Sequence, residues 1–207
     1  MKKILITSFL AFFSITSAFS AGMVGIKVGT GSLESTAVVT NDSSTTKDAD
    51  SEYGAIFAEF GLGSSPLSAG IEYIPYTATV GVDGSKTDSH LELSDHTTLY
   101  LLASKELTNG ASLYGKLGYS MADISAVTAN YEDTAASSPA DTLEGPMIGL
   151  GVQSSEFSQF GMIARLEATY TEYDDVSVTT TENGITETKK ATDTNLTTFS
   201  ISIAKQF

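Results

Sequence analysis

The sequence predicts an all-β protein, an eight-stranded antiparallel up-and-down barrel that spans a membrane through its strands. Beyond residue 21, apolar residues alternate with small or polar ones, which is the period of a strand with two different faces. Short and long connectors also alternate between these segments. An even number of strands, with short turns at one end and long loops at the other, is typical of transmembrane barrels.

The N-terminus has the features of a secretory signal peptide. Lys2 and Lys3 supply positive charge, residues 4–13 form a short apolar run, and residues 18–20 offer the small side chains that a signal peptidase reads. A retained membrane helix is the less favoured alternative, because Ser and Thr interrupt the apolar run and no basic flank follows it. The predicted boundaries are a signal peptide at 1–21 and a barrel domain at 22–207.

Two kinds of connector divide the barrel domain into eight segments. The short connectors lie at 63–66, 108–110 and 154–158. The long polar segments lie at 30–52, 77–96, 122–144 and 173–195. Within the last of these, residues 176–188 have the pattern of a β-hairpin centred on Asn183-Gly184, a pair that favours a type I′ turn. We therefore expect strands seven and eight to continue above the membrane as a ribbon.

Most predicted strands have one clearly apolar face. The final strand, residues 196–207, alternates apolar side chains with Ser and Ala. We expect the apolar face to meet lipid and the small face to meet a crowded interior. Near strand ends, where transmembrane barrels carry aromatic girdles, lie Tyr73, Tyr119, Tyr170 and Phe207.

Charged side chains on the inner face form the candidate site. Eight strands leave an interior just wide enough for side chains, so charges placed there must pair. We favour an ion-pair network that fills the lumen over a gate whose partners exchange. The strand at 97–105 is ambiguous, because an inward Lys105 turns Leu99 and Leu101 inward as well; a register irregularity and a partly apolar interior both remain open. The expected network comprises Lys27, Glu59, Glu72, Lys105, Lys116, Arg165 and Glu167.

Composition excludes several functional classes. A net charge of −14 argues against a nucleic-acid partner, because phosphate binding needs a basic face. The absence of cysteine excludes disulfides and thiolate metal sites. The long polar segments hold most of the acidic residues but show no calcium-loop spacing, so solvation is favoured over cation binding. We expect no metal and no cofactor.

A secreted β-sandwich is the soluble alternative, because its strands also alternate. The polar face of a sandwich meets water and is rich in Lys and Glu. Here the non-apolar face is mostly Gly, Ser and Ala, with a few charges of both signs. That composition suits a narrow interior, and it favours the barrel.

The sequence does not predict an enzyme. The only histidines, His90 and His96, lie in or beside a long polar segment, close to Asp88, Ser94 and Asp95. A surface catalytic triad is formally possible there. Such residues are nevertheless ordinary in polar loops, and we expect no strand-borne histidine to face the interior.

Several segments, taken in order, resemble the strands of OmpA-like and OmpX-like small outer-membrane barrels. The resemblance covers residues 22–207 and implies an interior set at Lys27, Glu72, Lys105, Lys116, Arg165 and Glu167. Gln153 stands where the larger OmpA-type proteins have an interior acid. The segments that carry the resemblance are 25–29, 70–73, 105–108, 112–119, 149–152 and 164–167.

The resemblance implies a place and a role. We expect a monomer in the outer membrane of a Gram-negative bacterium, surrounded by lipid and lipopolysaccharide. The barrel-assembly machinery is expected to recognise the C-terminal strand that ends at Phe207. The expected function is structural, or a surface contact through acidic extracellular loops. The alternative is a narrow, low-conductance pore for ions or small solutes.

Overall fold

The computed structural model describes residues 19–39, 43–75, 78–81, 90–128, 142–157, 161–182 and 185–207. The predicted signal peptide lies almost wholly outside these residues, so its boundary stays a prediction. Among the described residues, no helix is long and apolar enough to cross a membrane.

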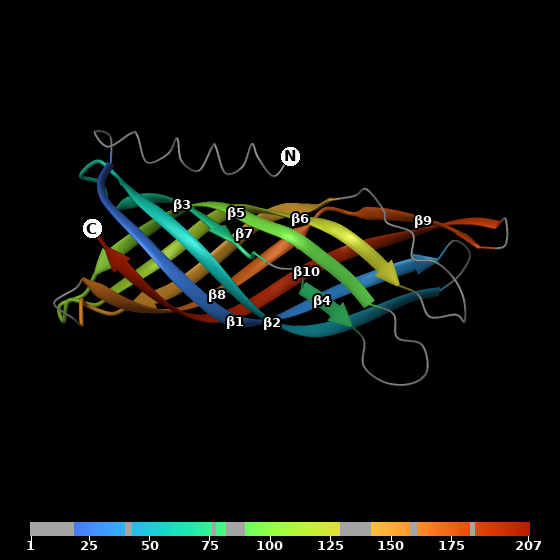
Figure 1. Cartoon of the computed structure of the whole chain (residues 1–207), viewed down its shortest axis with the longest axis horizontal. Coiled ribbons are helices and arrows are strands. Elements are labelled where there is room, and N and C mark those ends of the chain that lie inside the picture. The colour runs from blue at the N-terminus through green and yellow to red at the C-terminus, as the bar shows by residue number, and fades with distance from the viewer. Residues whose placement is uncertain are drawn as a thin grey trace.

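The described strands form one antiparallel sheet that closes into a barrel (Figure 1). The order is β1-β2-β3-β5-β6-β7-β8-β10, and β10 pairs with β1 to close it. The bounds are β1 Phe19–Val39, β2 Ser43–Leu62, β3 Leu67–Tyr73, β4 Ala78–Gly81, β5 His90–Glu106, β6 Ser112–Thr128, β7 Thr142–Gln153, β8 Met162–Tyr173, β9 Val176–Glu182 and β10 Ile185–Gln206.

In two places, a pair of strands occupies a single position in the wall of the barrel. β3 and β4 pair with successive parts of β5, and β8 and β9 pair with successive parts of β10. The described part of the chain therefore forms an eight-stranded barrel, as predicted. The short connectors and the C-terminus lie at one end of the barrel in Figure 1.

The strands extend further than the sequence predicted. β1 and β2 stay paired as far as Val39 and Ser43, so the segment 30–52 is largely strand and not loop. β5 and β6 likewise take in residues 90–96 and 122–128. Thr, Ser and Val favour extended backbone, but both faces of these extensions can be polar, so the apolar alternation that marks a strand is lost. The predicted ribbon at 176–188 is confirmed as β9 and the start of β10, although Asn183-Gly184 lies outside the described residues.

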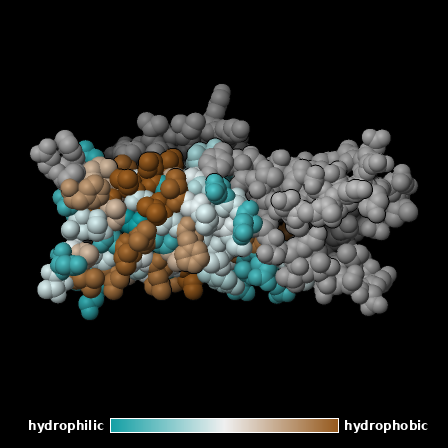
Figure 2. Space-filling view, turned by 90° about the horizontal axis from the view of Figure 1, so that it is seen from below, coloured by the Kyte–Doolittle hydropathy of each residue, from teal (hydrophilic) through white to brown (hydrophobic). Residues whose placement is uncertain are grey.

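The outward face carries an apolar belt. Leu150 is 73% exposed and Leu117 is 67% exposed. Figure 2 shows hydrophobic residues gathered in a band across the barrel, with hydrophilic residues on either side. A belt of this kind around a closed barrel is the surface that meets lipid. The predicted faces of the final strand are confirmed, because Phe199, Ile201 and Ile203 are exposed while Ser200, Ser202 and Ala204 are buried.

β5 corrects one prediction. Leu99 and Leu101 are exposed on the lipid face, whereas Tyr100 and Leu102 are buried in the lumen. Lys105 shares the parity of Leu99 and is exposed, so the prediction that it joins the interior network is wrong. The reason is that Tyr100 and Leu102 occupy the lumenal face of β5, and Lys105 lies on the opposite face by strand alternation. The register shifts between β5 and β6 lie nearer the start of β5, at Glu92/Leu93 and Ser94/Thr97.

We predict that Leu150→Arg destabilises the barrel by about 2–4 kcal/mol, because it places a charge in the middle of the apolar belt. The matched change Leu107→Arg, in a short connector at the barrel end, should cost about 0–1 kcal/mol. Urea unfolding of both variants in lipid vesicles, followed by circular dichroism, measures the difference. Equal costs would mean that the exposed apolar band does not face lipid.

Candidate functional site

Six of the seven predicted lumenal charges lie together inside the barrel. They come from five wall strands, β1, β2, β3, β6 and β8. Their side chains point inward because they alternate with the apolar residues of the belt. Five are almost fully buried, and the side chain of Glu72 retains 12% exposure. The six are Lys27, Glu59, Glu72, Lys116, Arg165 and Glu167.

Four of these residues form a closed ring of ion pairs. Lys27 Nζ contacts Glu72 and lies 2.5 Å from Glu167 Oε1. Lys116 Nζ lies 2.7 Å from Glu167 Oε2 and 3.8 Å from Glu72 Oε2. Each cation therefore serves both carboxylates, and each carboxylate serves both cations. Tyr114 donates a further hydrogen bond to Glu167, at 2.9 Å.

The remaining two residues form a bidentate pair. Arg165 Nη1 and Nη2 donate to the two oxygens of Glu59 at 2.6 and 2.7 Å. Tyr100 donates to Glu59 Oε1 at 2.8 Å. Arg165 Nε donates to Gln153 Oε1 at 2.8 Å, so Gln153 enters the network as a neutral acceptor. Parallel hydrogen bonds of this kind fix the guanidinium and the carboxylate in one plane.

Aromatic rings join the ring of four to the bidentate pair. Lys116 Nζ lies 4.0 Å from the centre of the Tyr100 ring, and the Arg165 guanidinium lies 5.1 Å from that of Tyr114. Such cation–π contacts stabilise a desolvated cation. The rings fit because glycines face them: a side chain at Gly70 would collide with Tyr100, and one at Gly151 would collide with Tyr114.

Charge in this network is balanced. Lys27, Lys116 and Arg165 contribute three positive charges, and the three glutamates contribute three negative ones. A single buried ion would be strongly unfavourable, whereas a set that is fully paired and hydrogen-bonded is tolerated. The arrangement holds side chains in place and leaves no net charge to attract a counterion.

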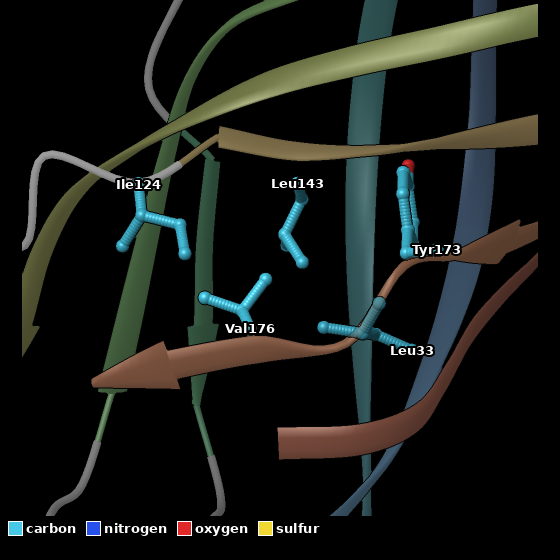
Figure 3. Packing of buried hydrophobic residues seen from close by; sticks show 5 residues of the cluster. All are labelled: Leu33, Ile124, Leu143, Tyr173 and Val176. Atoms are coloured by element: carbon cyan, nitrogen blue, oxygen red, sulfur yellow. The ribbon is translucent and has the colours of Figure 1, made fainter. Parts of the chain in front are cut away.

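Apolar layers lie on both sides of the network. On the side of the turns, Phe57 packs with Ile163 and Ala204, and its ring lies 5.5 Å from the Arg165 guanidinium. Toward the opposite end, side chains from β1, β6, β7, β8 and β9 point toward one another (Figure 3). This cluster consists of Leu33, Ile124, Leu143, Tyr173 and Val176, with Leu196 packed against it.

His96 corrects a second prediction. It lies on β5 and its ring points inward, with Nε2 3.2 Å from the hydroxyl of Tyr173. Asp95 is exposed and accepts a hydrogen bond from Tyr73 at 2.9 Å, so its carboxylate lies on the opposite face from His96. His96 alternates in step with Thr98, Tyr100 and Leu102, which are buried, so the strand phase that turns Lys105 outward also turns His96 inward. Asp88 lies outside the described residues, and only the backbone of His90 is described.

The comparisons with known proteins bear on this fold alone. No protein-family model and no curated protein matches the sequence. Among solved structures, the chain is similar to the outer membrane protein OprG from Pseudomonas aeruginosa, with a TM-score of 0.61 and 12% identity over 92% of this chain and 98% of that one. It is similar to the outer membrane protein AlkL in lipid bilayers, with a TM-score of 0.54 and 12% identity over 92% of each chain.

A third similar structure is Neisserial surface protein A, with a TM-score of 0.50 and 11% identity over 88% of this chain and 97% of that one. The chain has the fold of a small outer-membrane β-barrel. The barrel therefore matches the architecture that the OmpA-like and OmpX-like resemblance implied. Among the described residues, no group of three or more His, Asp or Glu side chains could hold a metal ion.

We predict that Glu59→Gln destabilises the barrel by about 3–5 kcal/mol, because it leaves the Arg165 guanidinium buried without a countercharge. The double variant Glu59→Gln/Arg165→Met should recover much of that loss, since the orphaned charge is then gone. The chain has no tryptophan, so unfolding in urea is followed by circular dichroism or by gel mobility. If the double variant were no more stable than Glu59→Gln, the pair would not be coupled.

We also predict that two lysine substitutions differ sharply. Lys116→Met removes a cation from the ring of four and should cost several kcal/mol, because two buried carboxylates are then left with Lys27 as their only ring cation. Lys105→Met changes an exposed side chain and should alter stability by less than about 0.5 kcal/mol. Urea midpoints in the same vesicles provide the comparison. Similar losses would place Lys105 inside the barrel.

Proposed function

We propose that the protein is a structural or surface-contact barrel of the bacterial outer membrane, which holds acidic segments at the cell surface. The observation that carries this proposal is the filled lumen. Six balanced charges occupy the middle of the barrel, and apolar clusters pack on both sides of them. An interior of this kind stabilises a scaffold and offers no wide aqueous path.

The long strands support the surface-contact role. β1, β2 and β10 continue well past the apolar belt and remain paired with one another, so a rigid extension rises from the barrel. Outer-membrane barrels carry their long segments on the outside of the cell and their short turns in the periplasm. The acidic residues of the long segments would then project outward, where they repel anionic surfaces and attract cationic ones.

The surroundings of the barrel follow from the same proposal. The apolar belt would be in contact with outer-membrane lipid and lipopolysaccharide. β10 would present its terminal segment, which ends at Phe207, to the barrel-assembly machinery, and the barrel would act as a monomer. A narrow pore has less support, because any path for ions would have to break the ring of four and part both apolar layers.

We predict that removing the charge of the long segments weakens attachment of cells to cationic surfaces. The variant carries Asp83→Asn, Asp88→Asn, Glu132→Gln and Asp133→Asn, which keeps the length of each segment. Cells that display it should bind polylysine-coated beads several-fold less than wild-type cells, and the difference should shrink in high salt because exposed charges are screened.

The matched control neutralises exposed acids in or beside the short connectors, with Glu106→Gln and Glu156→Gln. These positions lie at the opposite end of the barrel, so bead attachment should equal that of wild type. Gel mobility before and after boiling reports whether every variant is folded. If wild-type cells and cells with the four substitutions in the long segments attached equally well, the surface-contact proposal would be contradicted.

A further inference from the structure

A small chamber lies in the lumen between the ring of four and the apolar cluster of Figure 3. Its volume is about 80 Å³. Glu72 and Glu167 of the ring line it, and so does Leu196, which packs against the apolar cluster. The chamber therefore touches both the charged layer and the apolar layer of the lumen.

Hydroxyl groups make up most of the polar wall of this chamber. Thr98 and Ser120 share a hydrogen bond of 2.8 Å, and Thr169 and Thr198 share one of 2.7 Å. All four residues line the chamber, and they come from β5, β6, β8 and β10. A wall of this chemistry donates and accepts hydrogen bonds and carries no charge.

His96 supplies an unsatisfied polar atom to the same chamber. Its ring lines the cavity, and its Nδ1 is buried without a hydrogen-bond partner among the described residues. In the tautomer that donates Nε2–H to the Tyr173 oxygen, Nδ1 carries a lone pair that can accept a hydrogen bond. Buried polar atoms are almost always paired with protein or water, so this atom calls for a partner inside the cavity.

The occupant of the chamber is constrained by charge and size. The titratable and charged groups around His96 are Tyr53 on β2, Glu72 on β3, Tyr173 and Glu167 on β8, and Lys27 and Lys116 on β1 and β6. The charged groups among them balance, so no ion is required. Since a water molecule needs about 10–15 Å³ on this measure, the cavity has room for several waters.

Burial also lowers the pKa of His96, which lies above Leu99, the first apolar belt residue on its strand. Desolvation is the main cause, and Lys27 acts in the same direction, while Glu72 opposes both. The lowered pKa favours the neutral ring at pH 7, and acidification favours the protonated one.

We propose that this chamber is a binding site for water and for one proton, in which water joins His96 Nδ1 to the Glu72 carboxylate. On acidification this water accepts a proton from solvent hydronium and passes a proton to the Nδ1 lone pair, so the water stays neutral and the ring becomes an imidazolium. The imidazolium then competes with Lys27 for Glu72. Glu72 is the member of the network best able to respond, because its side chain is the most exposed of those in the ring of four.

This site does not depend on the proposed surface-contact function, because a barrel that conducted ions could hold it equally well. Solid-state NMR of the ¹⁵N-labelled protein in lipid bilayers tests it. Magnetisation transferred from water should reach His96 Nδ1 as quickly as it reaches exposed amides. The Lys27 ammonium signal should shift between pH 8 and pH 5 in the wild type and stay constant in His96→Gln.

The matched control is His90→Gln, which removes the only other histidine and should leave the Lys27 response unchanged. Absence of water transfer to Nδ1 would show a dry cavity and overturn the proposal. A pH-dependent shift of the Lys27 signal in His96→Gln equal to that of the wild type would also overturn it, because another group would then be the source. The water measurement uses the wild type alone, so the test stands even if a variant fails to fold.

Discussion

Every part of this barrel depends on compensation of charge in a narrow lumen. Eight strands enclose too little space for free water around an ion, so each buried cation must find a carboxylate. Lys27 and Lys116 share Glu72 and Glu167, and Arg165 grips Glu59 with two parallel hydrogen bonds. These contacts link strands that are distant in sequence, and they do so across the lumen rather than along the sheet.

The apolar layers follow from the same constraint. Phe57 and Ile163 lie on one side of the ion pairs, and Leu33 and Leu143 lie on the other, so the pairs have an apolar layer toward each end of the lumen. A lower local dielectric strengthens a paired charge and penalises an unpaired one. Loss of one member of the network is therefore expected to weaken the others, and the strands β1, β2 and β10 extend beyond the part of the barrel that holds it.

The sequence predicts best where lipid enforces a period of two. In the final strand the predicted faces are confirmed from Phe199 onward, because Phe199 and Ile201 must point to lipid and Ser200 must point inward. Prediction from the sequence fails where no contact with lipid imposes this alternation. Residues 30–52 are largely strand, yet their polar side chains on both faces resemble a loop, and only the backbone ladder reveals the pairing.

The interior site is predictable for the same reason, but the prediction is wrong at two positions, Lys105 and His96. Six charges alternate with belt residues, so their direction is fixed by their neighbours. Lys105 looked equivalent, but Leu99 and Leu101 on the same face meet lipid, while Tyr100 and Leu102 fill the lumen. His96 alternates in step with Tyr100, so the phase of this strand, which both apolar faces left undetermined, accounts for both failures.

Balanced ion pairs between apolar layers plug the lumen. Reconstitution of the wild-type protein into planar bilayers, with current recorded in molar salt, tests this directly. A plugged lumen predicts a quiet membrane with no long-lived conductance steps after confirmed insertion of folded barrel. Steady steps on the nanosiemens scale would require an open aqueous path and would contradict it.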